Sequence, residues 1–498
     1  MAGAMNVLFI TTDQQRFDAL GFMGHPDVQT PHLDRLAARS TVFERVYVTN
    51  PVCMPSRASL LLGQFPDAHG VRRNGIEVPD KPWGLAKTLR AHGYRTGMFG
   101  KTHFCPLRRD YRSDSIFHDW RSGEEYYGFE ERSITHDLKD FISDVSTAYH
   151  GATPKPEQMF AQDDYIDWIR SAHLDLYTLA VREGLPGGAQ EAARELWTSD
   201  LPVELHQSTW ITDQTMAFIE RQRATPFFAW CSFVDPHHPF NAPRAYRGLY
   251  DPAGLTGPIW QEGELEQRSR YHRDRHTSES APWTLHWREY RAQYYGMISL
   301  IDAQVARLVR HLEDLGVAEH TAIVFTSDHG EMLGDHGLAR KGLFHYEPLI
   351  RVPLLVCMPS GPSTGQRHRG IVQSVDITAT ILDFADVPLP EQHQGRSLLP
   401  WCRDGHDDAP REHALVSNGG EGPNYNPWPE LRTLVTDRWK LQYYVNEGRV
   451  ELDDLATDPD ELHPLDPEQH QPLVHDLMGR LVDASSAAST WGSHIGRW

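Results

Sequence analysis

Short apolar runs that end in polar residues recur along this chain. Each run is rich in Val, Ile, Leu and Phe on consecutive positions, which is typical of strands buried on both faces of a parallel sheet. The predicted strands are residues 6–12, 41–48, 94–100, 227–234, 321–326 and 351–357. Stretches with helical spacing separate several of them, including 85–92, 290–316 and 375–385. Strands that alternate with helices predict an α/β fold on a mostly parallel sheet.

The pattern changes in three places. Residues 105–224 and 241–287 lose the alternation, so we expect two irregular excursions from the sheet, with one helix at 210–222. Such excursions form either substrate lids or ordinary surface structure, and both alternatives stay open. Short alternating strands then appear at 414–417, 431–436, 440–445 and 449–453, followed by a helix at 471–484. We therefore predict a main domain at 1–410 and a smaller antiparallel subdomain at 411–498.

The net charge and the cysteine content exclude several classes of partner and of protein. The chain has 498 residues and a formal charge of -20, which argues against nucleic acid or an anionic membrane surface as a partner. Its five cysteines are scattered, so no disulfide framework is predicted. We find neither a signal peptide nor an apolar stretch long enough to span a membrane, and we expect a cytoplasmic enzyme.

One motif stands directly before an apolar run. Cys53, Pro55 and Arg57 have the spacing C-x-P-S-R, and the proline predicts a helix that begins at this point. A cysteine at a helix N-terminus faces free amides and the positive end of the helix dipole. Arg57 can add a planar cation beside it. The geometry suits a nucleophile that meets an anionic group; the alternative is a small buried cysteine with an arginine paired elsewhere.

Polar residues also follow several predicted strands, where open α/β sheets place their sites. Turn or helix-capping roles are the alternative for Asp13 and for Asp328 with His329, and Lys-x-His pairs such as Lys101 and His103 also occur by chance. Adjacent residues on extended backbone point to opposite sides, so we expect only one of His237 and His238 to serve. The residues concerned are Asp13 and Gln14, Lys101 and His103, His237 and His238, Asp328 and His329, and then Lys341.

Together these motifs resemble the type I, formylglycine-dependent sulfatases of the alkaline phosphatase superfamily, close to the bacterial arylsulfatase and phosphonate monoester hydrolase branch. The stretch from Glu451 to Glu461 resembles the C-terminal part of the same family. The resemblance implies an alkaline-phosphatase-like α/β fold, with a central mostly parallel sheet flanked by helices and a smaller C-terminal antiparallel sheet. It also implies that a formylglycine-generating enzyme oxidises Cys53 to formylglycine, whose hydrate attacks sulfur.

The resemblance further implies a role for each motif residue. His237 would protonate the leaving alcohol, and Arg57, Lys101 and Lys341 would supply a local positive field in an acidic protein. The implied catalytic residues are Cys53, Arg57, Lys101, His103, His237 and Lys341. The implied sulfate-binding residues are Asn74, Lys101, His103 and Lys341. The implied ligands of one divalent cation are Asp13, Gln14, Cys53, Asp328 and His329.

Two questions stay open after these assignments: which divalent cation binds, and which ester is hydrolysed. The oxygen-rich set favours Ca²⁺, while the histidine keeps Mn²⁺ and Mg²⁺ open. We expect hydrolysis of a small-molecule sulfate monoester. A phosphonate monoester or phosphodiester hydrolase with the same centre is the first alternative, because Gln14 and His329 also occur in that branch. A catalytically inactive anion-binding relative is the second. The alcohol part of the substrate and a homo-oligomeric state stay open.

Overall fold

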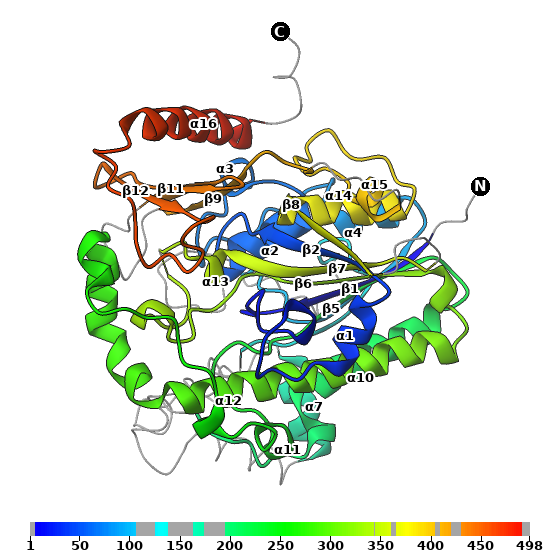
Figure 1. Ribbon diagram of the computed structural model, residues 1–498. Helices are drawn as coiled ribbons and strands as arrows, with labels where there is room; N and C mark the ends of the chain where they lie inside the picture. Colours follow the sequence, from blue (N-terminus) through cyan, green and yellow to red (C-terminus); the bar gives the residue numbers. More distant parts are fainter. Residues whose placement is uncertain are drawn as a thin grey trace, which may run out of the picture.

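The computed structural model in Figure 1 describes residues 5–105, 125–137, 163–173, 195–342, 344–359, 365–403, 409–419 and 430–490, with side chains of 275–285 left out. Its central sheet has 8 strands in the order β4-β3-β5-β1-β6-β7-β2-β8. The strands are β1 Asn6–Thr12, β2 Thr41–Tyr47, β3 Arg95–Gly100, β4 Glu131–Ile134, β5 Phe227–Ser232, β6 Thr321–Ser327, β7 Arg351–Cys357 and β8 Gln366–Gln373.

Only β7 runs antiparallel to its neighbours in this sheet. The predicted α/β fold with a mostly parallel sheet is therefore confirmed, and each predicted strand of the sheet is present. Two strands, β4 and β8, were not predicted. Both lie at the edges of the sheet and carry many partly exposed polar residues, so they lack the apolar run on which the prediction depended.

Helices cover both faces of the sheet (Figure 1). Alternate residues of β1 point to opposite sides: Val7 and Phe9 pack with helices α2, α4 and α14, whereas Leu8 and Ile10 pack with α1, α10 and α12. The helices of the main domain are α1 Pro31–Ala37, α2 Cys53–Leu62, α3 Pro66–His69, α4 Leu85–Ala91, α7 Asp164–Ala172, α10 Gln207–Gln222, α11 Arg244–Arg247, α12 Arg270–Asp314, α13 Glu347–Ile350, α14 Ser374–Phe384 and α15 Leu399–Arg403.

The second predicted excursion is partly wrong. Residues 241–287 were expected to be irregular, but α12 already begins at Arg270 and continues across a non-helical residue, His286, to Asp314. The first part of this helix is rich in Arg, His, Asp and Glu and has no apolar stripe, so the helical period was invisible there. Most of the first excursion, 105–224, lies outside the described residues apart from β4, α7, α10 and short connecting segments.

The smaller C-terminal sheet has the order β12-β11-β10-β9, with antiparallel pairing throughout. Helix α16 lies over this sheet (Figure 1). Its Leu477 and Leu481 pack against one leucine from each of the four strands: Leu415, Leu434, Leu441 and Leu452. The elements are β9 Ala414–Asn418, β10 Leu431–Val435, β11 Trp439–Tyr444, β12 Arg449–Asp454 and α16 Gln471–Ser489. The predicted antiparallel sheet is confirmed, and the boundary near residue 410 stays a prediction. Among the described helices, none combines the length and apolar character that crossing a bilayer demands.

A buried histidine in this fold predicts a pH-dependent stability. Burial lowers the pKa of His69 to about 3, and its Nδ1 accepts a hydrogen bond from the Val71 amide at 3.0 Å. The folded state therefore binds fewer protons than the unfolded state between the two pKa values, about 6.5 and about 3. Stability is complete above this window and falls as the pH drops through it, by at most about 1.4 kcal/mol per pH unit.

Urea unfolding at about pH 7 and about pH 5 checks this expectation. The His69→Gln variant, which keeps a polar side chain but does not titrate, is expected to lose less stability between the two pH values than the native chain. Equal losses in both proteins would contradict the assignment.

Candidate active site

Four adjacent strands bring the predicted polar residues to one edge of the sheet. In the order β3-β5-β1-β6, Lys101 follows β3, Asp13 follows β1 and Asp328 follows β6, while His237 lies in the loop after β5. The pairing of Thr12 with Ser327 places the ends of β1 and β6 side by side. Because parallel strands end together, side chains hundreds of positions apart meet at this edge.

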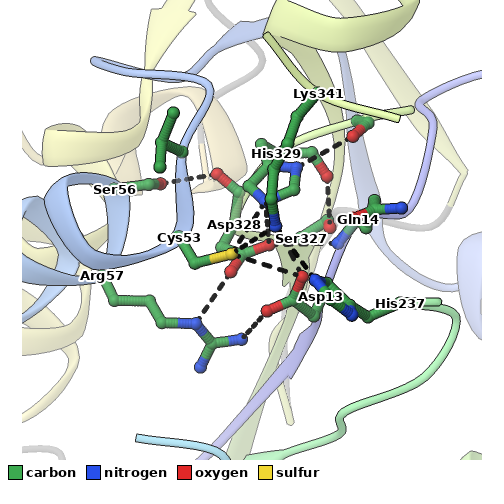
Figure 2. Close-up of polar contacts among 12 residues, drawn as sticks. Asp13, Gln14, Cys53, Ser56, Arg57, His237, Ser327, Asp328, His329 and Lys341 are labelled. Carbon is green, nitrogen blue, oxygen red and sulfur yellow. Dashed lines mark hydrogen bonds and ion pairs between the residues drawn. The ribbon is translucent and has the colours of Figure 1, made fainter. Parts of the chain in front are cut away.

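Cys53 is the first residue of α2 and points into this cluster (Figure 2). Its Sγ lies 2.6 Å from Lys341 Nζ, 3.2 Å from His329 Nε2 and 3.7 Å from Asp13 Oδ1. Only 1% of the cysteine is exposed. The Lys341 ammonium against the sulfur favours an anion at this position.

The Asn74 side chain contacts the first turn of the same helix from a separate loop. Its Oδ1 accepts a hydrogen bond from the Met54 amide at 3.0 Å, and the residue is exposed. In this structure Asn74 therefore caps the first turn of α2, and its predicted contact with a sulfate stays a prediction.

Four potential metal ligands converge beside the sulfur. One ligand atom from each of Asp13, Cys53, Asp328 and His329 lies within 4.8 Å of the others, and all four residues are buried. The His329 Nδ1–H donates to the Gly330 carbonyl at 2.8 Å, which leaves the Nε2 lone pair of the neutral ring facing the cluster. This donor set combines carboxylate oxygens with one imidazole nitrogen and fits a divalent cation.

Gln14 adds an amide oxygen. Its Nε2 donates a hydrogen bond to the Glu331 carboxylate and lies 3.3 Å from His238 Nδ1. Its buried Oε1, in contrast, has no hydrogen-bond partner among the described residues. A buried amide oxygen without a donor is costly, and a cation at the neighbouring carboxylates would satisfy it. The residue adopts a left-handed backbone conformation (φ 67°), and the Tyr294 hydroxyl holds it by donating to the Gln14 carbonyl at 2.7 Å.

Arg57 lies beneath these carboxylates. Its Nε donates to Asp328 Oδ2 at 2.7 Å and its Nη2 to Asp13 Oδ2 at 3.2 Å (Figure 2). Nη1 donates to the Lys101 carbonyl and the Ser232 hydroxyl. Every guanidinium nitrogen thus binds a protein group, so Arg57 orients the two carboxylates, and its predicted contact with a sulfate stays a prediction.

Two lysines flank the site from different sides. Lys101 Nζ lies 2.7 Å from Asp13 Oδ2, and Lys341 Nζ lies 3.0 Å from His237 Nε2. The His237 Nδ1–H donates to the His238 carbonyl at 2.6 Å, so the Nε2 of the neutral ring accepts from Lys341. His103 is buried, and its Nδ1 has no hydrogen-bond partner among the described residues. The structure therefore gathers Lys101, His103, His237 and Lys341 around the cysteine, as the sequence predicted.

The charges of this cluster control ionisation. Burial and the Asp13 carboxylate oppose ionisation of Cys53, but the ammonium groups of Lys341 and Lys101 outweigh them and hold the pKa of the thiol well below its usual range. Burial and Asp13 raise the pKa of Asp328 to about 6 despite Arg57. Burial also disfavours the charged form of Asp13, but Lys101 prevails and keeps the pKa of that carboxyl well below its normal value.

One expectation about the histidine pair is wrong. His237 and His238 were expected to point to opposite sides, yet their rings stack with centroids 4.0 Å apart. Residues 235–239 form turns and bends rather than extended backbone, so the alternation of a strand does not apply to them. His237 faces Lys341 and His238 faces Gln14, so both lie at the site.

Sequence reasoning missed two carboxylates of the site. Asp137 binds Lys101 Nζ at 2.6 Å and lies 3.7 Å from His237 Nδ1. It follows β4, the edge strand without an apolar run, so the strand-end rule could not be applied there. Glu331 binds Gln14 and accepts from the Leu333 amide at 2.9 Å. Its place three residues after Asp328, just beyond the end of β6, is the sequence signal that could have found it.

The comparisons with known proteins identify the family. A model described as "Sulfatase" matches residues 5–387, and one described as "N-sulphoglucosamine sulphohydrolase, C-terminal" matches residues 334–487. The chain belongs to the sulfatase family. This sulfatase is accordingly a sulfuric ester hydrolase with an alkaline-phosphatase-like fold.

The chain is similar to an arylsulfatase, to a multifunctional protein of the alkaline phosphatase superfamily and, in structure, to a phosphonate monoester hydrolase. An arylsulfatase of Clostridium perfringens is 29% identical over 92% of this chain and 89% of its own length. A multifunctional alkaline phosphatase superfamily protein, PehA, of Trinickia caryophylli is 29% identical over 80% of this chain and 77% of its own length. The solved structure of a phosphonate monoester hydrolase of Agrobacterium radiobacter superposes with a TM-score of 0.79 at 24% identity, covering 97% of this chain and 96% of that one.

Proposed function

We propose that this sulfatase hydrolyses sulfate monoesters through a formylglycine derived from Cys53, with one divalent cation in the site. The observation that carries the proposal is the convergence on one sulfur: Cys53 Sγ meets Lys341, His329 and Asp13 within 3.7 Å. A group attached at this position would sit between cationic side chains and a cation site. That environment suits a dianionic transition state at sulfur.

The proposed reaction uses the hydrated aldehyde at position 53. One hydroxyl passes its proton to the Asp328 carboxylate, whose pKa is raised to about 6, and its oxygen forms a bond to sulfur while the bond from sulfur to the alcohol oxygen breaks. His237, protonated at Nε2 when substrate binds, gives that proton to the leaving alcohol; in the structure this nitrogen lies 3.0 Å from Lys341 Nζ. The second hydroxyl then passes its proton to His237 Nε2, the carbon–oxygen bond to the sulfate breaks, and the aldehyde is regenerated. Asp328 releases its proton to water, and water rehydrates the aldehyde.

Chain residues would bind the anion and hold the cation. Lys101, His103 and Lys341 would contact the sulfate oxygens, and Arg57 fixes the carboxylates from below. Asp13, Gln14, Asp328, His329 and the modified residue 53 would hold the cation. When bound, the cation would neutralise negative charge and lower the pKa of a hydroxyl beside it. Its oxygen-rich ligand set favours Ca²⁺ over Mn²⁺ or Mg²⁺.

Metal removal gives a prediction with two readouts. Chelation is expected to abolish sulfatase activity and to lower the melting temperature, and Ca²⁺ is expected to restore both because it binds only the folded site. Asp13→Asn is expected to lose the Ca²⁺-dependent rise in melting temperature. Asp302→Asn changes a carboxylate that is buried elsewhere and caps α1 at Leu33, and it is expected to keep that rise. Equal melting temperatures with and without Ca²⁺ in the native protein would contradict a calcium site.

Kinetics on paired substrates test the reaction type. One preparation is assayed with a 4-nitrophenyl sulfate and with a 4-nitrophenyl phosphonate monoester. We expect a larger kcat/KM for the sulfate, because lysines 101 and 341 and His103 surround the anion position. A preference for the phosphonate would replace the proposal by its alternative, a phosphonate monoester hydrolase that uses the same centre. Location in the cytoplasm stays a prediction from the sequence.

A further inference from the structure

The C-terminal sheet buries many polar side chains against the main domain. One face, with Leu434 and Leu441, packs on α16, whereas the opposite face carries polar side chains that are at most 4% exposed beside apolar ones such as Val416 and Val435. These polar residues are Asn418, Thr433, Lys440, Gln442, Glu451 and Asp453. Buried polar groups need partners, and several of these side chains find them on the main domain.

Two of these side chains hold the segment that follows Lys341. Lys440 Nζ donates to the His345 carbonyl at 2.7 Å, and Thr433 Oγ1 lies 2.7 Å from His345 Nδ1. Lys440 also forms an ion pair with Glu461, whose other oxygen accepts from the Glu347 amide at 2.7 Å. Lys440, Glu461 and His345 are all at most 1% exposed. Residues 344–346 have no regular structure before α13 begins at Glu347, so these bonds to His345 and Glu347 hold the backbone there.

The same sheet also holds the segment that precedes Cys53. The Ser417 amide of β9 donates to the Thr49 carbonyl at 2.9 Å, and Asn50 Nδ2 donates to the Ser417 carbonyl at 2.7 Å. Asn50 Oδ1 in turn accepts from the Val52 amide, directly before the cysteine. The C-terminal sheet thus contacts both chain segments whose side chains meet at the Cys53–Lys341 contact.

We infer that Lys440 and Thr433 are positioning residues: they hold His345, four residues after Lys341, so that the Lys341 ammonium stays against the group at position 53. This rests on the proposed function of Lys341. Lys341 has a long, flexible side chain, so its placement depends on how firmly its backbone is held. Small displacements of a catalytic group lower the reaction rate strongly. The stretch from 451 to 461, which the sequence marked only by its resemblance to the C-terminal part of sulfatases, contributes Glu461, the ion-pair partner of Lys440.

A double-mutant cycle tests the inference. The paired change Lys440→Met with Glu461→Gln removes both charges, so that neither is stranded in the interior. Thr433→Val, which is nearly isosteric, is the second variant if the first fails to fold. Each is made in the native chain and in Lys341→Ala, and kcat and KM for an aryl sulfate are measured on folded, Ca²⁺-loaded enzyme. Mass spectrometry verifies equal conversion of Cys53 in every sample.

We expect a fall in kcat of about tenfold in the native background and less than about twofold in Lys341→Ala, because residues that act through one another are not additive. The matched control removes another buried pair, Arg411→Met with Asp376→Asn, and is expected to lower the melting temperature without coupling to Lys341. Equal losses in both backgrounds, or no loss in the native one, would overturn the inference alone. Full activity of Lys341→Ala itself would refute the proposed role of Lys341 and the inference with it.

Discussion

Replacing Cys53 by alanine is expected to lower kcat for sulfate esters by about 10⁴-fold or more, the scale seen when a covalent nucleophile is deleted. The sulfur is the atom on which Lys341, His329 and Asp13 converge, and the variant removes the group from which the proposed nucleophile is formed. The other cation ligands and the lysines remain, so substrate binding is expected to survive. Initial rates on an aryl sulfate, with calorimetric binding of the same ester, measure both effects.

Cys231→Ala is the matched control. Both cysteines are buried, yet burial raises the pKa of Cys231 to about 12, whereas the lysines hold the pKa of Cys53 well below its usual range. Cys231 lies inside β5, so its loss is expected to reduce stability slightly and leave activity intact. Mass spectrometry of the peptide around Cys53 should show a species lighter than cysteine in active preparations. Native activity in Cys53→Ala would refute the covalent mechanism.

Replacing Arg57 by leucine is expected to lower the free energy of unfolding of the cation-free protein by about 3–5 kcal/mol, the cost of leaving buried charges without their partner. Its guanidinium is the shared partner of Asp13 and Asp328, and all three side chains are at most 1% exposed. The same variant is expected to lose most of its activity, because the two carboxylates lose their fixed orientation. Urea unfolding with and without Ca²⁺ measures the first effect.

Two comparisons make the Arg57 result specific. Arg57→Lys keeps the charge but not the planar fork, so it is expected to recover only part of the lost stability. Arg221→Leu breaks an ion pair with Glu131 whose arginine is 54% exposed, and such a change costs about 0–1 kcal/mol. Ca²⁺ should offset part of the Arg57→Leu loss, since it supplies positive charge to the same carboxylates. An unfolding free energy within error of the native value would contradict the buried ion-pair assignment.

Local sequence features predicted much of the fold. Apolar runs marked the central strands because a strand buried on both faces must be apolar along its whole length. Pro55 marked the start of α2, and the structure begins that helix at Cys53. The positions of Asp13 and Asp328 at strand ends, together with the resemblance to sulfatases, predicted that the two residues share a site. None of these steps needed knowledge of distant contacts, because each depends on neighbouring residues.

Features without a local signal were missed. The first part of α12 is polar, and β4 is a partly exposed edge strand, so neither has the periodicity that burial imposes. Asp137, which follows β4, was missed for the same reason, although it binds Lys101. The stacking of His237 on His238 depends on the turns of that loop, which the alternation rule does not cover.

The sequence by itself determined which strands are buried, where the helix of Cys53 begins and which polar residues stand at strand ends. Only the tertiary structure decided which of those polar residues pair with one another. Arg57 binds the carboxylates of Asp13 and Asp328, and Lys341 binds the cysteine. The tertiary structure also decided that the polar face of the C-terminal sheet is buried. The physical reason is that local pattern reports the hydrophobicity of a position, whereas the partner of a buried charge is set by which distant segments fold against it.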